Sequence, residues 1–188
     1  MNAKDELVRY YRWLRQYGLN DSHSGNASIR IDDAVWVTPG GCCADTLVAE
    51  DLVRCALDGD PSDGASLDAP LHLSVYRRSP ATAAILHSHG PHCIALTLDG
   101  QELAPRDFEG AYYFDHVPLL DIEYRDYLAE SPTAVSEALS HARIAIVKGH
   151  GVYAHGENLG LAYKWTCALE ASARIIYLTS QNTPARES

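Results

Sequence analysis

The stretch AAILHSHGPHC, residues 83–93, joins an apolar run to three closely spaced histidines, His87, His89 and His92. The apolar part predicts a buried strand, and Pro91 predicts the first turn of a short helix. Residues i and i+2 of an extended segment project from the same face, so His87 and His89 point the same way. Two imidazoles on one face can bind one metal ion, although such pairs also occur at solvated strand ends.

A second apolar run, RIAIVKG at 143–149, leads directly to His150. If both runs are strands that end at the same edge of a sheet, three imidazoles meet there. Three neutral nitrogens with one open position are typical of a catalytic zinc site rather than a closed structural one. The sequence therefore predicts a metal centre on His87, His89 and His150.

A carboxylate suited to proton transfer is found in the segment SLDAPLHLSVYR, residues 66–77. Pro70 predicts a helix over 69–78, with Asp68 at its N-terminus, where the helix dipole favours an ionised carboxylate. By itself Asp68 is more readily interpreted as a helix cap, with an acid/base group next to the metal as the alternative. His72, one turn later, is expected to pack in the core.

Composition limits the class of protein. The chain has 188 residues, a hydrophobic fraction of 46% and a formal charge of −10. These values favour one globular domain over 1–188, with 180–188 as a flexible tail, and they disfavour nucleic acid as a partner. The charged first residues predict no signal peptide, and no apolar run approaches the roughly 20 residues of a membrane span. An odd number of cysteines without a CxxC pair favours reduced thiols and a cytoplasmic location.

The remaining pattern alternates helices and strands, and the pair Asp32-Asp33 reads as a hairpin turn. This arrangement predicts an α/β fold, a layered α/β/α domain with a mixed, largely antiparallel central sheet. Asn158 is expected to cap the last helix. Helices are predicted at 4–17, 44–55, 69–78, 132–141 and 158–179, and strands at 26–31, 34–39, 82–89, 116–120 and 143–149.

These motifs resemble the class II aldolase/adducin family in order and spacing, from about Leu7 to Thr179. The matching segments include GLNDSHSGNASIR, VWVTPGG, SLDAPLHLSVYR, AAILHSHGPHC and IAIVKGHGVYAHGENLG. The resemblance implies zinc, or another divalent metal such as Mn²⁺ or Co²⁺, on His87, His89 and His150. It also implies that Asp68 is the acid/base group, in place of the family's usual glutamate. His92 fits the family pattern but is not a ligand there.

The resemblance further implies an anion pocket built from three loops. Backbone amides in such loops form a nest that holds negative charge. Two hydroxyl-bearing residues of the family pattern are replaced by His23 and Leu67, so we expect phosphorylated substrates not to be markedly preferred. The residues that occupy the family's pocket positions are His23, Gly25, Asn26, Thr38, Gly40 and Ser66.

A loop rich in aromatic residues follows the first histidine motif. The family's fuculose-phosphate aldolases carry a His-Tyr pair in this loop, and its tyrosine donates a proton to the active site of the neighbouring subunit. In this chain Asp107-Phe108 occupies the position of that pair. Tyr112 and Tyr113 are candidates to replace that tyrosine, and packing in a subunit interface is the alternative. The aromatic residues between 108 and 114 predict a homo-oligomer, most simply a tetramer, with active sites at its interfaces.

The resemblance implies a metal-dependent lyase that acts on a small molecule, with no nucleic acid and no membrane as partners. A Lewis-acid metal together with Asp68 would cleave a C–C bond of a hydroxycarbonyl compound, such as a deoxy-sugar phosphate, through an enediolate. The same groups would support decarboxylation or dehydration, which is the alternative function. A non-catalytic assembly module like that of adducin is the second alternative.

Overall fold

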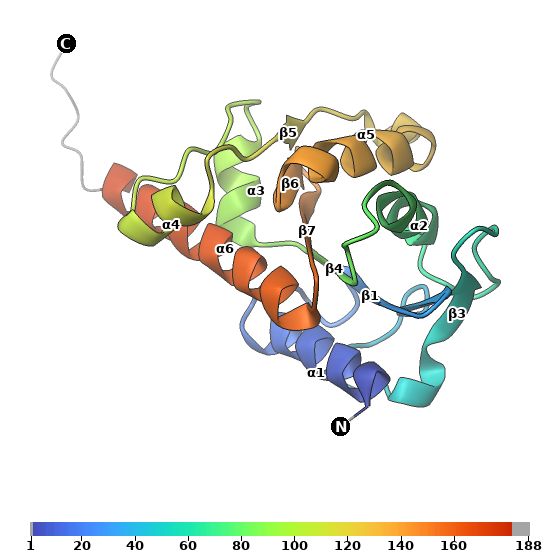
Figure 1. Ribbon diagram of the computed structural model, residues 1–188. Coiled ribbons are helices and arrows are strands. Elements are labelled where there is room, and N and C mark those ends of the chain that lie inside the picture. Colours follow the sequence, from blue (N-terminus) through green and yellow to red (C-terminus); the bar gives the residue numbers. More distant parts are fainter. Residues whose placement is uncertain (1, 182–188) are drawn as a thin grey trace, which may run out of the picture.

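The computed structural model describes residues 2–181, and one mixed sheet forms its centre (Figure 1). The strand order is β3-β2-β1-β4-β7-β6-β5. Among these strands, β5 and β6 run parallel and every other neighbouring pair runs antiparallel. The predicted mixed, largely antiparallel sheet is thus confirmed. The strands are β1 (Asn26–Ile31), β2 (Ala34–Val37), β3 (Val53–Ala56), β4 (Ala84–Ser88), β5 (Leu119–Leu120), β6 (Ile144–Val147) and β7 (Gly151–Gly156).

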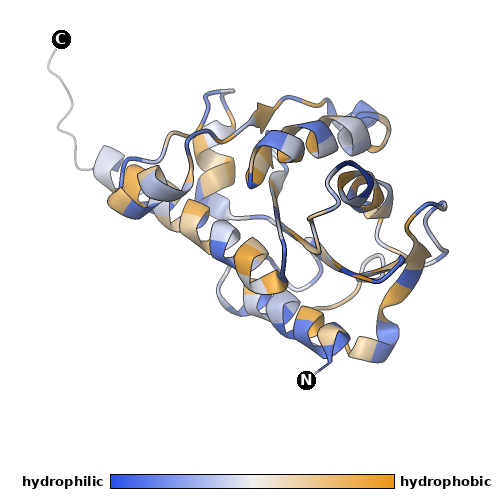
Figure 2. Ribbon diagram, viewed as in Figure 1, coloured by the Kyte–Doolittle hydropathy of each residue, from blue (hydrophilic) through white to orange (hydrophobic). Residues whose placement is uncertain are grey.

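Helices cover both faces of this sheet, which makes the fold a three-layer α/β/α arrangement (Figure 1). Hydrophobic and hydrophilic residues alternate along these helices (Figure 2), and their buried residues are largely apolar. Within the described part of the chain, no helix combines the length and apolar character needed to cross a bilayer. One face carries α1 (Ala3–Gln16), α3 (Pro91–Thr97), α4 (Phe108–Tyr113) and α6 (Leu159–Gln181), and the other carries α2 (Ala69–Arg78) and α5 (Tyr127–His141).

Side-chain alternation along β4 assigns its residues to the two faces. Ala84 and Leu86 pack against the layer of α1 and α6. Ile85 belongs to the core under α2 and α5, and His87 shares its face because it follows two residues later. The first histidine of the motif is therefore buried beneath α2, the helix that begins next to Asp68.

Most predicted elements are observed. The helix over 69–78 is confirmed as α2, and the hairpin turn holds Asp32 at a positive φ of 55°. The Asn158 side chain accepts a hydrogen bond from the backbone N–H of Leu161 at 2.9 Å, as expected of the cap of α6. The predicted loose tail at 180–188 falls outside the described residues except for Ser180 and Gln181, which are the last residues of α6.

One predicted helix is wrong. Residues 44–55 form a short 3-10 helix, η1 (Ala49–Asp51), and then enter β3. Cys55 pairs with Val35 of β2 and is fully buried in the core under α2, so pairing at the sheet edge outweighs the helical spacing of the apolar residues. The elements β7 and α4 were not predicted, and the strand expected at 116–120 shrinks to Leu119–Leu120.

Candidate metal centre and active site

The two histidine-bearing segments meet because of the position of β7. Strands β4 and β6 are both antiparallel to β7, so they run in the same direction with β7 between them. His150 lies in the turn from β6 to β7 and thereby reaches the end of β4. Gly151 permits this approach, because a Cβ atom there would fall 2.9 Å from ring atoms of both His87 and His89.

The three predicted ligands converge on one point. The Nε2 atom of His87 lies 3.0 Å from Nε2 of His89 and 3.3 Å from Nε2 of His150. One ligand nitrogen from each of the three residues lies within 4.8 Å of the others. Nitrogens around a tetrahedral zinc, each about 2.0 Å from the ion, lie roughly 3.3 Å apart. The two distances from His87 fit such an ion.

The hydrogen bonds of His87 also fit a metal ligand. Its Nδ1 atom lies 3.1 Å from the carbonyl oxygen of Val152, an acceptor, so Nδ1 carries the hydrogen and Nε2 presents its lone pair. Three nitrogens with lone pairs that face one another repel unless a cation or a proton lies between them. Burial lowers the pKa of His87 well below its ordinary value, and burial likewise lowers the pKa of His89 and of His150. Neutral imidazole is the form that binds metal.

Asn20 holds the end of β4 in place, a role that sequence reasoning did not identify. Its side-chain oxygen accepts a hydrogen bond from the backbone N–H of His89 at 2.8 Å, and its amide nitrogen donates to the carbonyl of His87. Gly25 packs directly against the Asn20 side chain and the carbonyl oxygen of His87. A Cβ atom at this position would overlap both of them. The backbone that carries the first two histidines is therefore braced by residues of the loop before β1.

Asp68 lies beside the three histidines rather than capping α2. Its side chain makes no capping hydrogen bond and is buried, with Oδ2 3.9 Å from Nε2 of His87. Burial alone would raise the pKa of Asp68, but His87 and the hydrogen bond from Asn26 outweigh it and lower the pKa to about 2. The carboxylate is therefore ionised near neutral pH and is able to accept a proton.

Two tyrosines that the sequence did not single out complete the surroundings of Asp68. Tyr153 donates to Oδ2 at 2.7 Å and Tyr127 donates to Oδ1 at 2.8 Å, while Nδ2 of Asn26 donates to Oδ2 at 2.7 Å. Tyr153 could have been found from its position two residues after Gly151. In the pairing of β4 with β7 it lies opposite His87, and so on the same face of the sheet. The sequence around Tyr127 carries no comparable signal.

The predicted anion-binding residues gather at the mouth of the same site. Together with Asp68 and the three histidines they line a cavity of about 540 Å³. Thr38 is the exception, because it is fully buried and its hydroxyl accepts a hydrogen bond from the backbone N–H of Ala27. Arg125 adds a guanidinium to the rim, where it pairs with Asp126 at 3.2 Å. The members of the predicted set that line the cavity are His23, Gly25, Asn26, Gly40 and Ser66.

A second hollow of about 490 Å³ opens on the other side of the histidines. Both hollows are lined by His89, His150 and Tyr127, so they adjoin at the histidine cluster. Ile122 and Val147 line the wall of the second hollow together with Lys148.

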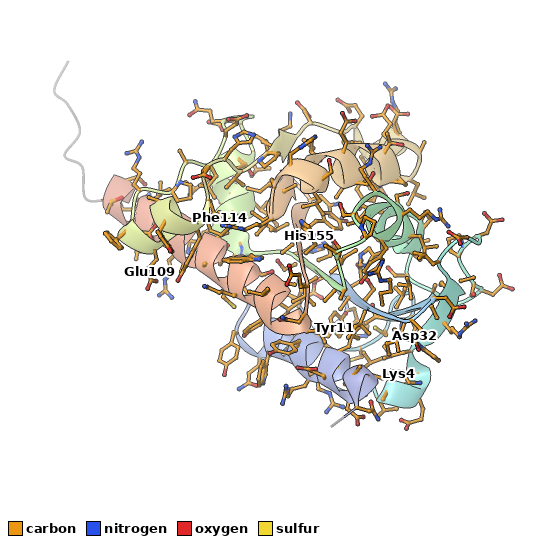
Figure 3. All side chains as sticks on the ribbon, in the orientation of Figure 1. Lys4, Tyr11, Asp32, Glu109, Phe114 and His155 are labelled. Carbon is orange, nitrogen blue, oxygen red and sulfur yellow. The ribbon has the colours of Figure 1, made fainter. Side chains whose placement is uncertain are left out.

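Tyr112 and Tyr113 lie outside both hollows of this protomer. They belong to α4, which packs against α6 on the opposite face of the sheet from α2, near the labelled Glu109 and Phe114 (Figure 3). Tyr113 contacts the ring of Trp165, whereas Tyr112 is 77% exposed. Any part that either tyrosine has in catalysis would require a neighbouring subunit.

His92 and His72 have other partners than the metal-binding histidines. Nδ1 of His92 lies 2.7 Å from the carboxylate of Glu170, on the α6 side of the sheet. His72 is fully buried, as expected, and its Nδ1 atom lies 2.6 Å from the hydroxyl of Ser28. Neither residue lines the cavity.

Comparison with known proteins identifies the family. The model of the class II aldolase and adducin N-terminal domain matches residues 5–177. The structure of L-fuculose-1-phosphate aldolase from Thermus thermophilus is similar with a TM-score of 0.89 and 31% identity, covering 97% of this chain and 96% of that one.

Two curated relatives carry the names of other reactions. Methylthioribulose-1-phosphate dehydratase of Gluconobacter oxydans is 29% identical over 89% of this chain and 91% of its own length. The 3-oxo-tetronate 4-phosphate decarboxylase of Pectobacterium atrosepticum is 29% identical over 94% of this chain and 84% of its own length. From the match over most of its length and the shared fold, the chain belongs to the class II aldolase and adducin N-terminal domain family.

Proposed function

We propose that this protein, a metal-dependent lyase of the class II aldolase type, cleaves a C–C bond of a small hydroxycarbonyl compound with an anionic end group. The observation that carries the proposal is the convergence of three imidazole nitrogens beside a buried, ionised carboxylate at the base of a cavity. Zinc is the metal that best suits three neutral nitrogens with an open position.

Each part of the site has a role in this reaction. His87, His89 and His150 would hold the ion, which when bound supplies a Lewis acid for the carbonyl oxygen and its neighbour. Asp68 would accept the proton of the hydroxyl group on the carbon that becomes an aldehyde. As the C–C bond breaks, its electron pair moves toward the carbonyl, and the proton then returns to the carbon left behind.

The loop nest would hold the anionic end of the substrate. Backbone amides near Gly25 and Gly40, with Arg125 at the rim, supply positive potential in a chain whose net charge is −10. The three relatives above are each named for a phosphorylated compound, which favours a phosphate ester as the anionic group of the substrate. His23 and Leu67 replace two hydroxyl donors, which favours a carboxylate or an unphosphorylated compound instead. Matched substrates will decide between these two arguments.

Dehydration or decarboxylation is the second candidate function, because both relatives named for these reactions match at 29% identity. The test is a product assay on zinc-loaded protein with a panel of hydroxycarbonyl compounds, following released aldehyde, released CO₂ and loss of the hydroxyl group separately. Release of an aldehyde that depends on both zinc and Asp68 supports the proposal. Turnover of the panel only to CO₂ or to a dehydrated ketone would replace it, and a protein that binds no zinc and turns over none of the panel would favour an adducin-like assembly role.

Two further aspects belong to this proposal. The protein would act as a homo-oligomer, most simply a tetramer, since the exposed aromatic residues Phe108 and Tyr112 on α4 suit a subunit interface. It would work in the cytoplasm, a compartment that agrees with the free state of its five cysteines.

A further inference from the structure

We infer that Tyr127 and Tyr153 are positioning residues that hold the Asp68 carboxylate beside the metal position rather than on it. In this arrangement the open coordination position is left to the substrate. The inference rests on the proposed metal centre and concerns how this chain's own residues shape it.

The first support is the set of hydrogen bonds around Asp68. An ionised carboxylate has about four acceptor sites, and three donors already occupy this one. Two of the three are the hydroxyls of Tyr127 and Tyr153, which approach different oxygens of the carboxylate and also contact each other. For Asp68 to move onto the ion, it would have to give up some of these charge-assisted hydrogen bonds.

The second support is that both tyrosine rings are fixed against metal-binding histidines. The ring of Tyr153 stacks on His87 with centroids 4.0 Å apart, and the edge of Tyr127 meets His150 at 4.6 Å. Tyr153 is fully buried within the sheet, and Tyr127 begins α5. The two hydroxyls therefore hold a constant position relative to the histidines, and they impose that position on the carboxylate.

The third support is distance. Oδ2 of Asp68 is 3.9 Å from Nε2 of His87, whereas the nitrogens of His89 and His150 are 3.0 and 3.3 Å from the same atom. The ligand atoms that converge on one point are those of the three histidines, within 4.8 Å of one another, and this group does not include a carboxylate oxygen of Asp68. An aspartate is also one methylene shorter than a glutamate at the same place, which shortens the reach of the carboxylate toward the histidines.

The test uses cobalt-substituted and zinc-loaded protein. The visible absorption bands of Co²⁺ report which groups coordinate the ion, and competition with a chromophoric chelator reports zinc affinity. The variants are Asp68→Asn, Tyr127→Phe, the double variant Tyr127→Phe/Tyr153→Phe, and that double variant combined with Asp68→Asn. Tyr17→Phe is the matched control, because Tyr17 is exposed and lines neither hollow.

We expect Asp68→Asn and Tyr17→Phe to keep the cobalt band positions of the wild type. The double tyrosine variant should shift the bands and bind zinc about 10-fold more tightly, since the released carboxylate becomes a ligand. Adding Asp68→Asn should abolish both changes. Tyr127→Phe alone should show part of the effect, which keeps the test available if the double variant does not fold.

Two results would overturn the inference. If Asp68→Asn by itself shifts the cobalt bands, the carboxylate already coordinates the ion in the wild type. If the tyrosine variants keep both the wild-type bands and the wild-type zinc affinity, the hydroxyls do not hold the carboxylate away. A wild type that binds no zinc would instead overturn the metal centre and the proposed function with it.

Discussion

The ring of Tyr153 lies flat on the imidazole of His87, with the two planes 2° from parallel. The two residues are partners across the antiparallel pair of β4 and β7, where facing side chains are closest. The contact restrains the imidazole so that Nε2 faces the other two histidines, and it aims the tyrosine hydroxyl at Asp68. One cross-strand pair thus orients both the histidine cluster and the Asp68 carboxylate.

Zinc binding should depend on His150. Purified wild type should contain one zinc per chain, and His150→Ala should lower zinc affinity by on the order of 100-fold or more, because two imidazoles remain where three converged. Elemental analysis and chelator competition measure this. His116→Ala is the control, since His116 is largely exposed and pairs with Glu102 at 4.0 Å, away from the histidine cluster. Full zinc retention by His150→Ala would remove His150 from the site.

Turnover should depend on the Asp68 carboxylate. Asp68→Asn should retain zinc but lower kcat by a factor on the order of 10²–10⁴, the usual contribution of a general acid/base. The amide keeps the shape of the side chain but cannot accept the proton. Asp63→Asn, an exposed position in the preceding loop, should leave kcat unchanged. A normal kcat for Asp68→Asn would limit this residue to a structural role.

Substrate preference should follow the two altered positions of the anion pocket. We expect wild type to favour a phosphorylated ketose over its unphosphorylated or carboxylated analogue by less than about 100-fold in kcat/KM. The double variant His23→Thr/Leu67→Ser should raise this preference, because each hydrogen bond restored to a charged group contributes roughly 1.5–3 kcal/mol. A larger preference in the wild type would show that the loop amides and Arg125 hold phosphate without the missing hydroxyls.

Stability should fall at mildly acidic pH because of His72. Burial lowers the pKa of His72 to about 4, although Asp68 acts in the opposite direction. An unfolded histidine has a pKa near 6.5, so between about pH 6.5 and 4 the unfolded chain binds more protons and folding loses stability as the pH drops. Above about pH 6.5 the effect is absent.

The expected loss from His72 is about 2 kcal/mol between pH 7.5 and pH 5, from the difference between the two pKa values. Urea unfolding at both pH values measures it. His72→Asn should reduce the pH dependence by that amount, because the amide offers Ser28 a hydrogen bond without titrating. Tyr17→Phe, which removes no histidine from the chain, should leave the dependence as in the wild type. An equal pH dependence in His72→Asn and wild type would contradict the assignment.

The exposed residues of α4 should control assembly. Sedimentation should show a homo-oligomer, and the double variant Phe108→Ser/Tyr112→Ser should shift it toward smaller species, because both side chains are largely exposed in the protomer. If a neighbouring subunit's Tyr112 also reaches the active site, Tyr112→Phe should lower kcat without changing the oligomeric state. A stable, fully active monomer would rule out sites that depend on an interface.

Much of the fold was predictable because its elements have strong local signals. Pro70 and the apolar spacing after it predict α2, and Asn158 predicts the start of α6. Prediction failed where pairing with a distant strand decides the conformation. Residues 53–56 follow a helical spacing, yet they form β3 because β2 offers unpaired edge groups. The strand β7 was overlooked because its glycines and its histidine hide an otherwise apolar pattern.

The sequence by itself determined the three metal-binding candidates, since His87 and His89 share a strand face and His150 follows a second buried run. It also indicated the carboxylate at the start of α2. Only the tertiary structure decided what surrounds that carboxylate, because Tyr127 and Tyr153 lie 59 and 85 residues away in the chain and meet Asp68 through the packing of α5 and the pairing of β7 with β4. Hydrogen bonds between such distant residues depend on how whole elements pack, and no local pattern records that.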